Sequence, residues 1–173
     1  MNHLIFSIIS VVFICAITAP ISQRRITCNA PYYGMGNGDG VLDSHCYKLQ
    51  AQLSKAAYKG NSKKVKELLR QGANADSSAG DYVPPLYGAA SQGKNEVVKV
   101  LLENGANINR RFTLNGPPLF AAIYGNHLET AELLLSRGAN VNFQNGDETA
   151  LRLAKSKGNE RMVTLLKKYG AKE

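Results

Sequence analysis

Few residues in this sequence have the types and spacings that catalysis or metal binding requires. After the apolar N-terminal segment the histidines are His45 and His127, and no Cys-x-x-Cys, His-Glu-x-x-His or nucleophile-elbow pattern occurs. The glycine-rich stretch from Pro31 to Gly40 lacks the spacing and the terminal glutamate of a calcium loop, and it follows no predicted strand. We therefore expect no enzymatic activity, no cofactor and no metal site.

The cysteines point to a covalent bond instead. Cys28 and Cys46 both lie ahead of the regular part of the chain, and no cysteine occurs from Tyr47 onward. An even pair in an exported chain suggests a disulfide that pins the N-terminal leader to the start of that regular part. The alternative is two unrelated thiols.

The elements that position these residues are indicated by a repeat. The motif Leu-Leu-x-x-Gly-Ala-Asn begins at Leu68, Leu101 and Leu134, and a shortened copy ends on Gly170-Ala171. The glycines of these copies are separated by 33, 33 and 32 residues. A fixed period in this range indicates an array of stacked units, each built from one supersecondary element.

Each unit has the pattern of a helical hairpin. In the second unit, apolar residues recur at i, i+3 and i+4 from Leu86 and again from Val98, which predicts two short amphipathic helices. Pro85 and Pro118 mark the first turn of a helix, where proline is tolerated. Between the paired helices we expect left-handed turn residues, namely Gly60, Gly93, Asn126 and Gly158.

The sequence resembles the ankyrin repeat family over about Ser44 to Glu173, most clearly in the stretches Pro85 to Gly93 and Val97 to Asn109. The resemblance implies an all-α solenoid of four stacked helix-turn-helix units with connecting turns or short hairpins. We expect these units at about residues 44–74, 75–107, 108–140 and 141–173. Such an array has an extended concave face and no enclosed pocket.

The family's usual Thr-Pro-Leu-His stretch is altered in every unit that carries a counterpart. Tyr87, Phe120 and Arg152 stand where the family has histidine. Aromatic side chains at two of these positions either pack between units, which is the interpretation we favour, or contact a partner.

Lysines mark the two ends of the expected array. Lys155 stands where the other units have Ala57, Ala90 and Ile123, which predicts a solvent-facing last unit. From Lys48 to Arg70, seven basic residues face Glu67 alone, and the whole chain has a net charge of +8. This basic first unit is either a solvated cap, which is the interpretation we favour, or a face that attracts anionic lipid, nucleic acid or an acidic protein.

The resemblance also implies a function, which is binding another protein through the turn tips and the exposed side of the first helices. Tyrosine, phenylalanine and arginine are enriched at interface hot spots, so these residue types in those regions are candidates. The candidates are Tyr82, Tyr87, Arg110, Arg111, Phe112, Tyr124, Phe143 and Arg152, of which Arg110-Arg111-Phe112 is the strongest. The alternative for each is that it merely fills a gap between units. We expect a monomer, and an exported chain makes nucleic acid a poor partner.

The N-terminus indicates where the protein works. Leu4 to Ala19 carries no charge over 16 residues, which predicts a signal peptide at residues 1–19, cleavage near Ala19 and export to the periplasm or medium. Residues 20–43 would then be a flexible leader. Two alternatives remain, a buried N-terminal helix and a retained membrane anchor. The absence of Lys or Arg before the segment and the pair Arg24-Arg25 after it favour an anchor from Leu4 to Ile21, with the basic first unit against anionic lipid.

Overall fold

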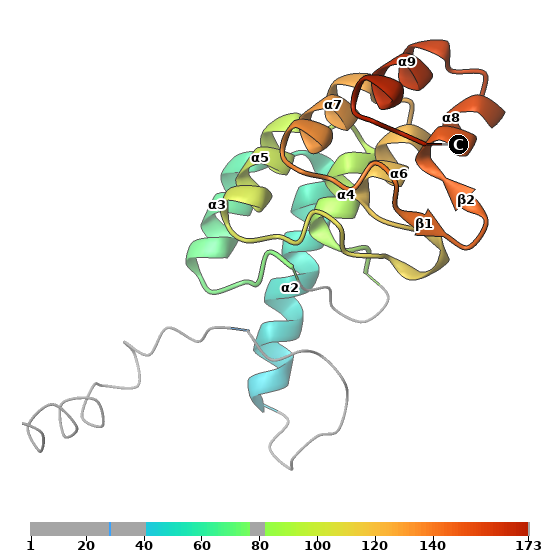
Figure 1. Cartoon of the computed structure of the whole chain (residues 1–173). Helices are drawn as coiled ribbons and strands as arrows, with labels where there is room; N and C mark the ends of the chain where they lie inside the picture. The colour runs from blue at the N-terminus through green and yellow to red at the C-terminus, as the bar shows by residue number, and fades with distance from the viewer. Residues whose placement is uncertain (1–27, 29–40, 77–81, 173) are drawn as a thin grey trace, which may run out of the picture.

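The computed structural model describes Cys28, residues 41–76 and residues 82–172, and these residues form four consecutive helical hairpins (Figure 1). The first helices of the hairpins are α2 (Val41–Lys59), α4 (Pro85–Ser91), α6 (Pro118–Tyr124) and α8 (Ala150–Ser156). The second helices are α3 (Ser62–Arg70), α5 (Asn95–Glu103), α7 (Leu128–Ser136) and α9 (Glu160–Lys168). The expected all-α array of four units is confirmed. The N-terminal segment that we interpret as a signal or anchor lies outside the described residues.

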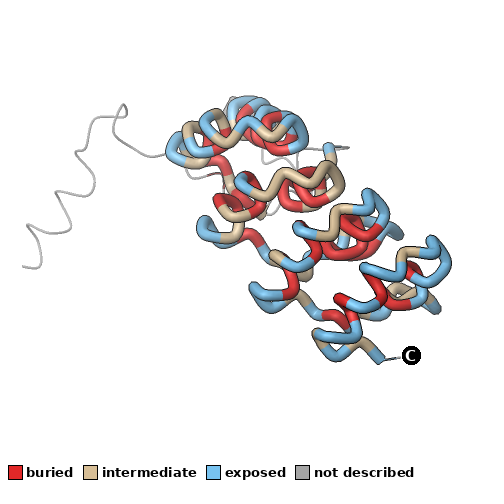
Figure 2. The backbone as a smooth tube through the Cα atoms, turned by 90° about the horizontal axis from the view of Figure 1, so that it is seen from above, coloured by how far each residue is buried: buried red, intermediate tan, exposed pale blue. Residues whose placement is uncertain are grey.

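The hairpins stack in two layers. The first helices contact one another in the order α2, α4, α6, α8, and the second helices follow in the order α3, α5, α7, α9. We call these the inner and outer layers. Figure 2 shows the units following one another with buried residues running between them and exposed residues on the turns. The core is therefore continuous along the array, because each unit covers the apolar face of the next.

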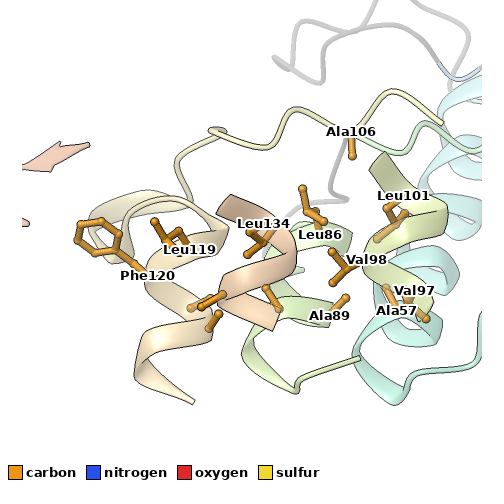
Figure 3. Close-up of a cluster of buried hydrophobic side chains, with 14 of the residues drawn as sticks. Ala57, Leu86, Ala89, Val97, Val98, Leu101, Ala106, Leu119, Phe120 and Leu134 are labelled. Carbon is orange, nitrogen blue, oxygen red and sulfur yellow. The ribbon is translucent and has the colours of Figure 1, made fainter. Parts of the chain in front are cut away.

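The apolar columns of the sequence form this core. Leu53, Leu86, Leu119 and Leu151 occupy equivalent positions in the inner helices, and each is at most 4% exposed. In the outer layer Leu101 is fully buried and lies close to Val98 (Figure 3). Removing these side chains from water is the main driving force for stacking the short helices, which would not be stable alone.

The turns between paired helices have the expected left-handed backbone. The φ angles are +78° at Gly60, +65° at Gly93, +58° at Asn126 and +64° at Gly158. At Gly93 the next unit adds a second requirement, because a Cβ atom there would lie 2.6 Å from Nδ1 of His127. The His127 ring packs over this turn, and its Nε2 lies 3.0 Å from the carbonyl oxygen of Ser91. The turn glycine and the histidine thus join the second unit to the third.

The connections between units, which we call fingers, comprise residues 71–84, 104–117 and 137–149. The second finger contains a 3₁₀ turn, η2 (Thr113–Asn115). The third contains a two-stranded hairpin in which β1 (Gln144–Asn145) pairs antiparallel with β2 (Glu148–Thr149). The second and third fingers lie on the side of the array away from the outer helices α5 and α7 (Figure 1).

A ladder of side-chain hydrogen bonds ties each finger to the next, and the third finger to the segment after α9. Asp76 Oδ1 accepts from the Asn107 N–H at 3.0 Å. Asn109 Oδ1 accepts from the Asn140 N–H at 2.8 Å, and Asn142 Oδ1 accepts from the Lys172 N–H at 2.8 Å. The donors follow the Gly-Ala motif of each unit, so the ladder repeats with the period of the sequence.

The first helix of the first unit, α2, is longer than the first helices of the other units. Helix α2 has 19 residues, whereas α4 has seven, and α2 begins three residues before the expected start of the domain at Ser44. In these extra turns the buried Gln50 accepts from the Asn74 N–H at 3.1 Å and donates to the Asn74 carbonyl oxygen. Gln50 therefore makes the contact that an earlier finger would otherwise provide.

Lysines close the stack at both ends. Lys155 is exposed, as predicted, where Ala57, Ala90 and Ile123 are fully buried in the other units. At the other end Lys55 is exposed, whereas the equivalent residues Gly88, Ala121 and Leu153 are buried against the preceding unit. A further unit could stack on either end only by burying one of these charges, which is energetically costly.

Candidate protein-binding surface

The structure brings the sequence-predicted binding residues to the side of the array formed by the fingers and the inner helices. Three of them are in the second finger, and the others lie in the remaining fingers and on α4, α6 and α8. In chain order they are Tyr82, Tyr87, Arg110, Arg111, Phe112, Tyr124, Phe143 and Arg152. Their individual contacts differ, and these contacts separate residues that hold the array together from residues whose surface remains available.

The two arginines of the second finger connect neighbouring fingers. Arg110 Nη1 lies 3.1 Å from Asp76 Oδ2 and also donates to the Asp76 carbonyl oxygen. Arg111 Nη2 donates to Asn145 Oδ1 at 3.1 Å, and the same amide donates through Nδ2 to the Leu114 carbonyl oxygen at 2.6 Å. Both arginines remain exposed, but their guanidinium groups are already engaged within the array.

The aromatic residues of the fingers pack against the inner helices. The rings of Phe112 and Tyr87 are tilted by 54° with centroids 5.1 Å apart, and both side chains are half-buried. Burial raises the pKa of the Tyr87 phenol. Phe143 meets Phe120 edge to face with centroids 6.4 Å apart, and Phe120 is fully buried. Phe120 stands where the family usually has histidine. The expectation that an aromatic side chain at this position packs between units is confirmed.

Tyr124 stands at the end of α6 with 43% of its surface exposed. Its hydroxyl donates to Glu148 Oε2 at 2.9 Å, and Lys157 Nζ lies 5.3 Å from its ring centroid. Burial, and after it the hydrogen bond to Glu148, raises the pKa of this phenol, so the hydroxyl remains a donor at neutral pH. The ring borders an open hollow of about 520 Å³ whose other walls are Asn126 and residues 157–161.

Arg152 is bound within its own unit. Its guanidinium donates to the Asp147 carbonyl oxygen at the turn of the β1–β2 hairpin, and its side chain is exposed. The arginine therefore steadies the third finger against α8, much as Arg110 and Arg111 connect fingers elsewhere.

Three exposed apolar residues were missed by sequence reasoning. Leu114, at the tip of the second finger, is 85% exposed, and the preceding Thr113 has a φ of +50°, which is unusual for a β-branched residue. On α2, Tyr58 is 49% exposed and Tyr47 is 41% exposed. Tyr58 stands two repeat periods before Tyr124, so the register of the repeat could have identified it. For Leu114 the available signal was an apolar residue in a polar turn.

The exposed large apolar residues are distributed unevenly. Among the described residues they lie on α2, α6 and the fingers, and none lies on the outer helices α3, α5, α7 and α9. Tyr58 reaches the second unit, because its Cδ2 lies 3.7 Å from the point where a Cβ on Gly88 would stand. We call the set that spans the first three units the aromatic surface; it comprises Tyr58, Tyr82, Tyr87, Leu114 and Tyr124.

The N-terminal leader contacts the first unit at Cys28. This residue is buried, and its N–H donates to the Gly72 carbonyl oxygen at 3.1 Å, at the end of α3. Its Sγ lies 2.16 Å from that of Cys46 on α2, with Cα atoms 5.5 Å apart. The leader therefore meets the array at its N-terminal end.

Within the described part of the chain, no three or more His, Cys, Asp or Glu side chains gather in a way that could hold a metal ion. In the same part, no helix combines the length and the apolar character needed to cross a bilayer. The hollow beside Tyr124 is open to solvent, with mixed basic, acidic and amide walls.

A stacked helical array with an uneven apolar surface defines a class of protein, the repeat scaffold that offers an extended face to other molecules. A family model described as ankyrin repeats, in three copies, matches residues 53–145, which is more than half of the chain. The chain belongs to the ankyrin repeat family. Helices α8 and α9 extend the repeat beyond the matched residues as a fourth unit. None of the curated proteins compared with the chain matches it. Ankyrin repeats are generally modules of protein–protein interaction, and the family is generally non-enzymatic.

Proposed function

We propose that this protein is an exported, monomeric and non-enzymatic module that captures another protein on its aromatic surface. The observation that carries the proposal is the uneven distribution of exposed apolar side chains. The outer helices present none of the large ones, whereas Tyr58, Tyr82, Leu114 and Tyr124 are each at least 43% exposed on the inner helices and fingers. Exposed apolar groups gathered on one side of a soluble fold are typical of interaction sites.

Binding would use a surface that is already formed. Asp76 of the first finger binds Asn107 and Arg110 of the second, and Arg111 of the second finger binds Asn145 of the third, so these parts of the surface are held in place before any partner arrives. Preorganisation lowers the entropy cost of association. Tyrosine adds a large apolar face with a hydroxyl at its end, a combination that is enriched at interface hot spots.

This proposal can be tested by site-specific photocrosslinking in the native host. A benzophenone amino acid at Tyr82 or at Leu114 should form an adduct with one and the same protein, because both side chains are exposed on the aromatic surface. The matched control is the same amino acid at Glu103, which is exposed at the end of the outer helix α5. Equal adduct formation from Glu103 would contradict the proposed site.

The captured protein should then be titrated against purified chain. We expect Leu114→Ala to weaken its binding by about fivefold or more, since an energetically important interface side chain contributes over about 1 kcal/mol. The substitution should leave thermal unfolding unchanged, because Leu114 is 85% exposed. Unchanged affinity would move the contact to another part of the array.

The export part of the proposal rests on the uncharged segment from Leu4 to Ala19. Protein recovered from the native host should begin near Ala19 or Pro20, and N-terminal sequencing measures this directly. A chain that retains Met1 in the membrane fraction would replace export with the tethered arrangement.

Export would also expose Cys28 and Cys46 to an oxidising compartment, where we expect them to form a disulfide. The proposal is supported by the burial of Cys28 against the first unit, where its Cα atom lies 5.5 Å from that of Cys46 on α2. The bond would keep the leader on the first unit, beside the carbonyl group of Gly72.

A further inference from the structure

We propose that the N-terminal end of the array docks on an anionic membrane surface through a basic end face. The basic end face comprises Lys48, Lys55 and Lys59 of α2 together with Lys63 and Lys64 at the start of α3. The proposal is independent of the aromatic surface, because the two surfaces use different side chains.

The three lysines of α2 form one stripe. Their spacing of seven and four residues places Lys48, Lys55 and Lys59 on the same side of the helix, and all three are exposed. In the inner units the position of Lys55 is buried against the preceding unit, so this stripe faces outward along the axis of the array. Within the described part of the chain, no ion pair involves Lys48, Lys55, Lys59 or Lys63.

Among the described residues, one acid forms an ion pair with a lysine of this face. Glu67 pairs with Lys64 at 3.1 Å, which leaves the other four lysines of the face uncompensated among the described residues. A cap needs to be polar in order to stay soluble, but it does not need charges of one sign. Closely spaced uncompensated lysines create a positive potential that attracts anionic headgroups.

The C-terminal end is also basic, but three of its cations, Lys168, Lys157 and Arg152, contact other groups of the array. Lys168 lies 3.6 Å from Glu132 and also stands over the Tyr169 ring. Lys157 stands over Tyr124, and Arg152 donates to Asp147. These contacts draw several positive groups back toward the protein, whereas the lysine stripe on α2 extends into solvent.

The uncharged N-terminal segment of the sequence also favours membrane docking at the N-terminal end of the array. Cys28 meets α2 and α3 there, through Cys46 and the Gly72 carbonyl group. The uncharged segment ends at Ala19, nine residues earlier, and nine residues span at most about 30 Å. If that segment is retained in a bilayer, it holds the N-terminal end of the array at the headgroups. The charged contact itself does not require that the segment be retained.

Docking in this direction would leave the aromatic surface accessible. Helices α2 and α3, which carry the basic end face, lie at one end of the array, and the inner helices α4 and α6 follow along its side (Figure 1). The proposal therefore assigns the two surfaces to two partners, a membrane at the end and a protein at the side.

The test measures partitioning of the full chain onto vesicles of neutral phosphatidylcholine and onto vesicles that contain about 30% phosphatidylglycerol. The ratio of the two partition coefficients isolates the effect of charge, because apolar insertion contributes to both. We expect the wild-type ratio to be about 600-fold, since each of the four uncompensated lysines near an anionic surface contributes about fivefold. Raising the salt from about 0.1 M to about 1 M should bring the ratio close to one, because the screening length falls from about 10 Å to about 3 Å.

Two variants with the same change in net charge make the test specific. Lys48→Glu, Lys55→Glu and Lys59→Glu together should reduce the ratio to about one or below. Arg161→Glu, Lys167→Glu and Lys172→Glu alter exposed residues of the last unit and should leave the ratio within about threefold of wild type. Circular dichroism should show the same helix content for both variants, since all six side chains are exposed.

Two outcomes would overturn the proposal. Equal losses in both variants would mean that vesicles sense only the total charge, and an undiminished ratio in the α2 variant would mean that its lysines form only a solvated cap. Neither outcome affects the crosslinking expected at Tyr82 and Leu114, so failure here is distinguishable from failure of the proposed protein binding.

Discussion

Replacing Phe120 by alanine is expected to lower the free energy of unfolding by about 3 to 5 kcal/mol, the usual cost of removing a fully buried phenylalanine. Phe120 is among the largest fully buried side chains of the described chain, and Figure 3 shows it at the α6 end of the core. Its ring also meets Phe143 of the third finger. The substitution would leave a cavity between the third and fourth units, and denaturant unfolding monitored by circular dichroism measures the loss.

Tyr124→Ala provides the matched control for this prediction, because it removes another aromatic ring from the same helix. Tyr124 is 43% exposed and makes one hydrogen bond to Glu148. We expect a loss of about 1 kcal/mol or less, as is usual for a partly exposed group. Similar losses of stability in the two variants would show that Phe120 does not stabilise the packing between units as its burial predicts.

The second large effect is expected at the cysteine pair. Cys46→Ser should lower the free energy of unfolding by about 3 kcal/mol, because in the chain-entropy model a bond that closes a loop of this size restricts the unfolded chain by that amount. The two cysteines are 18 residues apart, and Cys28 is buried against the first unit. Denaturant unfolding of the exported protein without reductant measures the difference.

Reductant supplies the control for the cysteine prediction. With dithiothreitol present, wild type and Cys46→Ser should unfold at about the same denaturant concentration, since both then lack the bond. The unreduced wild-type chain should be two hydrogens lighter than the reduced chain. If the masses agree and the stabilities already coincide without reductant, the two thiols are free and the leader is held by the Cys28 hydrogen bond and packing alone.

The repeat made most of the fold predictable. The turn positions Gly60, Gly93 and Asn126 were expected from spacing and have positive φ angles. The apolar spacing predicts amphipathic helices, and Leu68, Leu101 and Leu134 of the repeated motif are fully buried. A local pattern succeeds here because each unit contacts only its neighbours, so one period of sequence contains most of the contacts of one unit.

The candidate site was less predictable, since residue type does not show whether a side chain is already engaged. Arg110 is of a residue type enriched at hot spots, yet its guanidinium binds Asp76 of the preceding finger. Leu114 was not a candidate, although it is the most exposed of the large apolar residues described. The engagement of Arg110 and the exposure of Leu114 both depend on how neighbouring fingers contact each other. These contacts follow from how the units stack.

The sequence by itself determined the period, the helical hairpin of each unit and the array of four, because these follow from apolar spacing and from residues that end helices. Only the tertiary structure decided which polar residues join neighbouring units. Gln50 of the first unit, for example, bonds to the backbone of Asn74, and Asn109 of the second finger bonds to Asn140 of the third. The structure also separated the buried Phe120 from the exposed Tyr124 on the same short helix. The physical reason is that burial and hydrogen-bond pairing are properties of the stacked neighbours, whereas periodicity is a property of one chain segment.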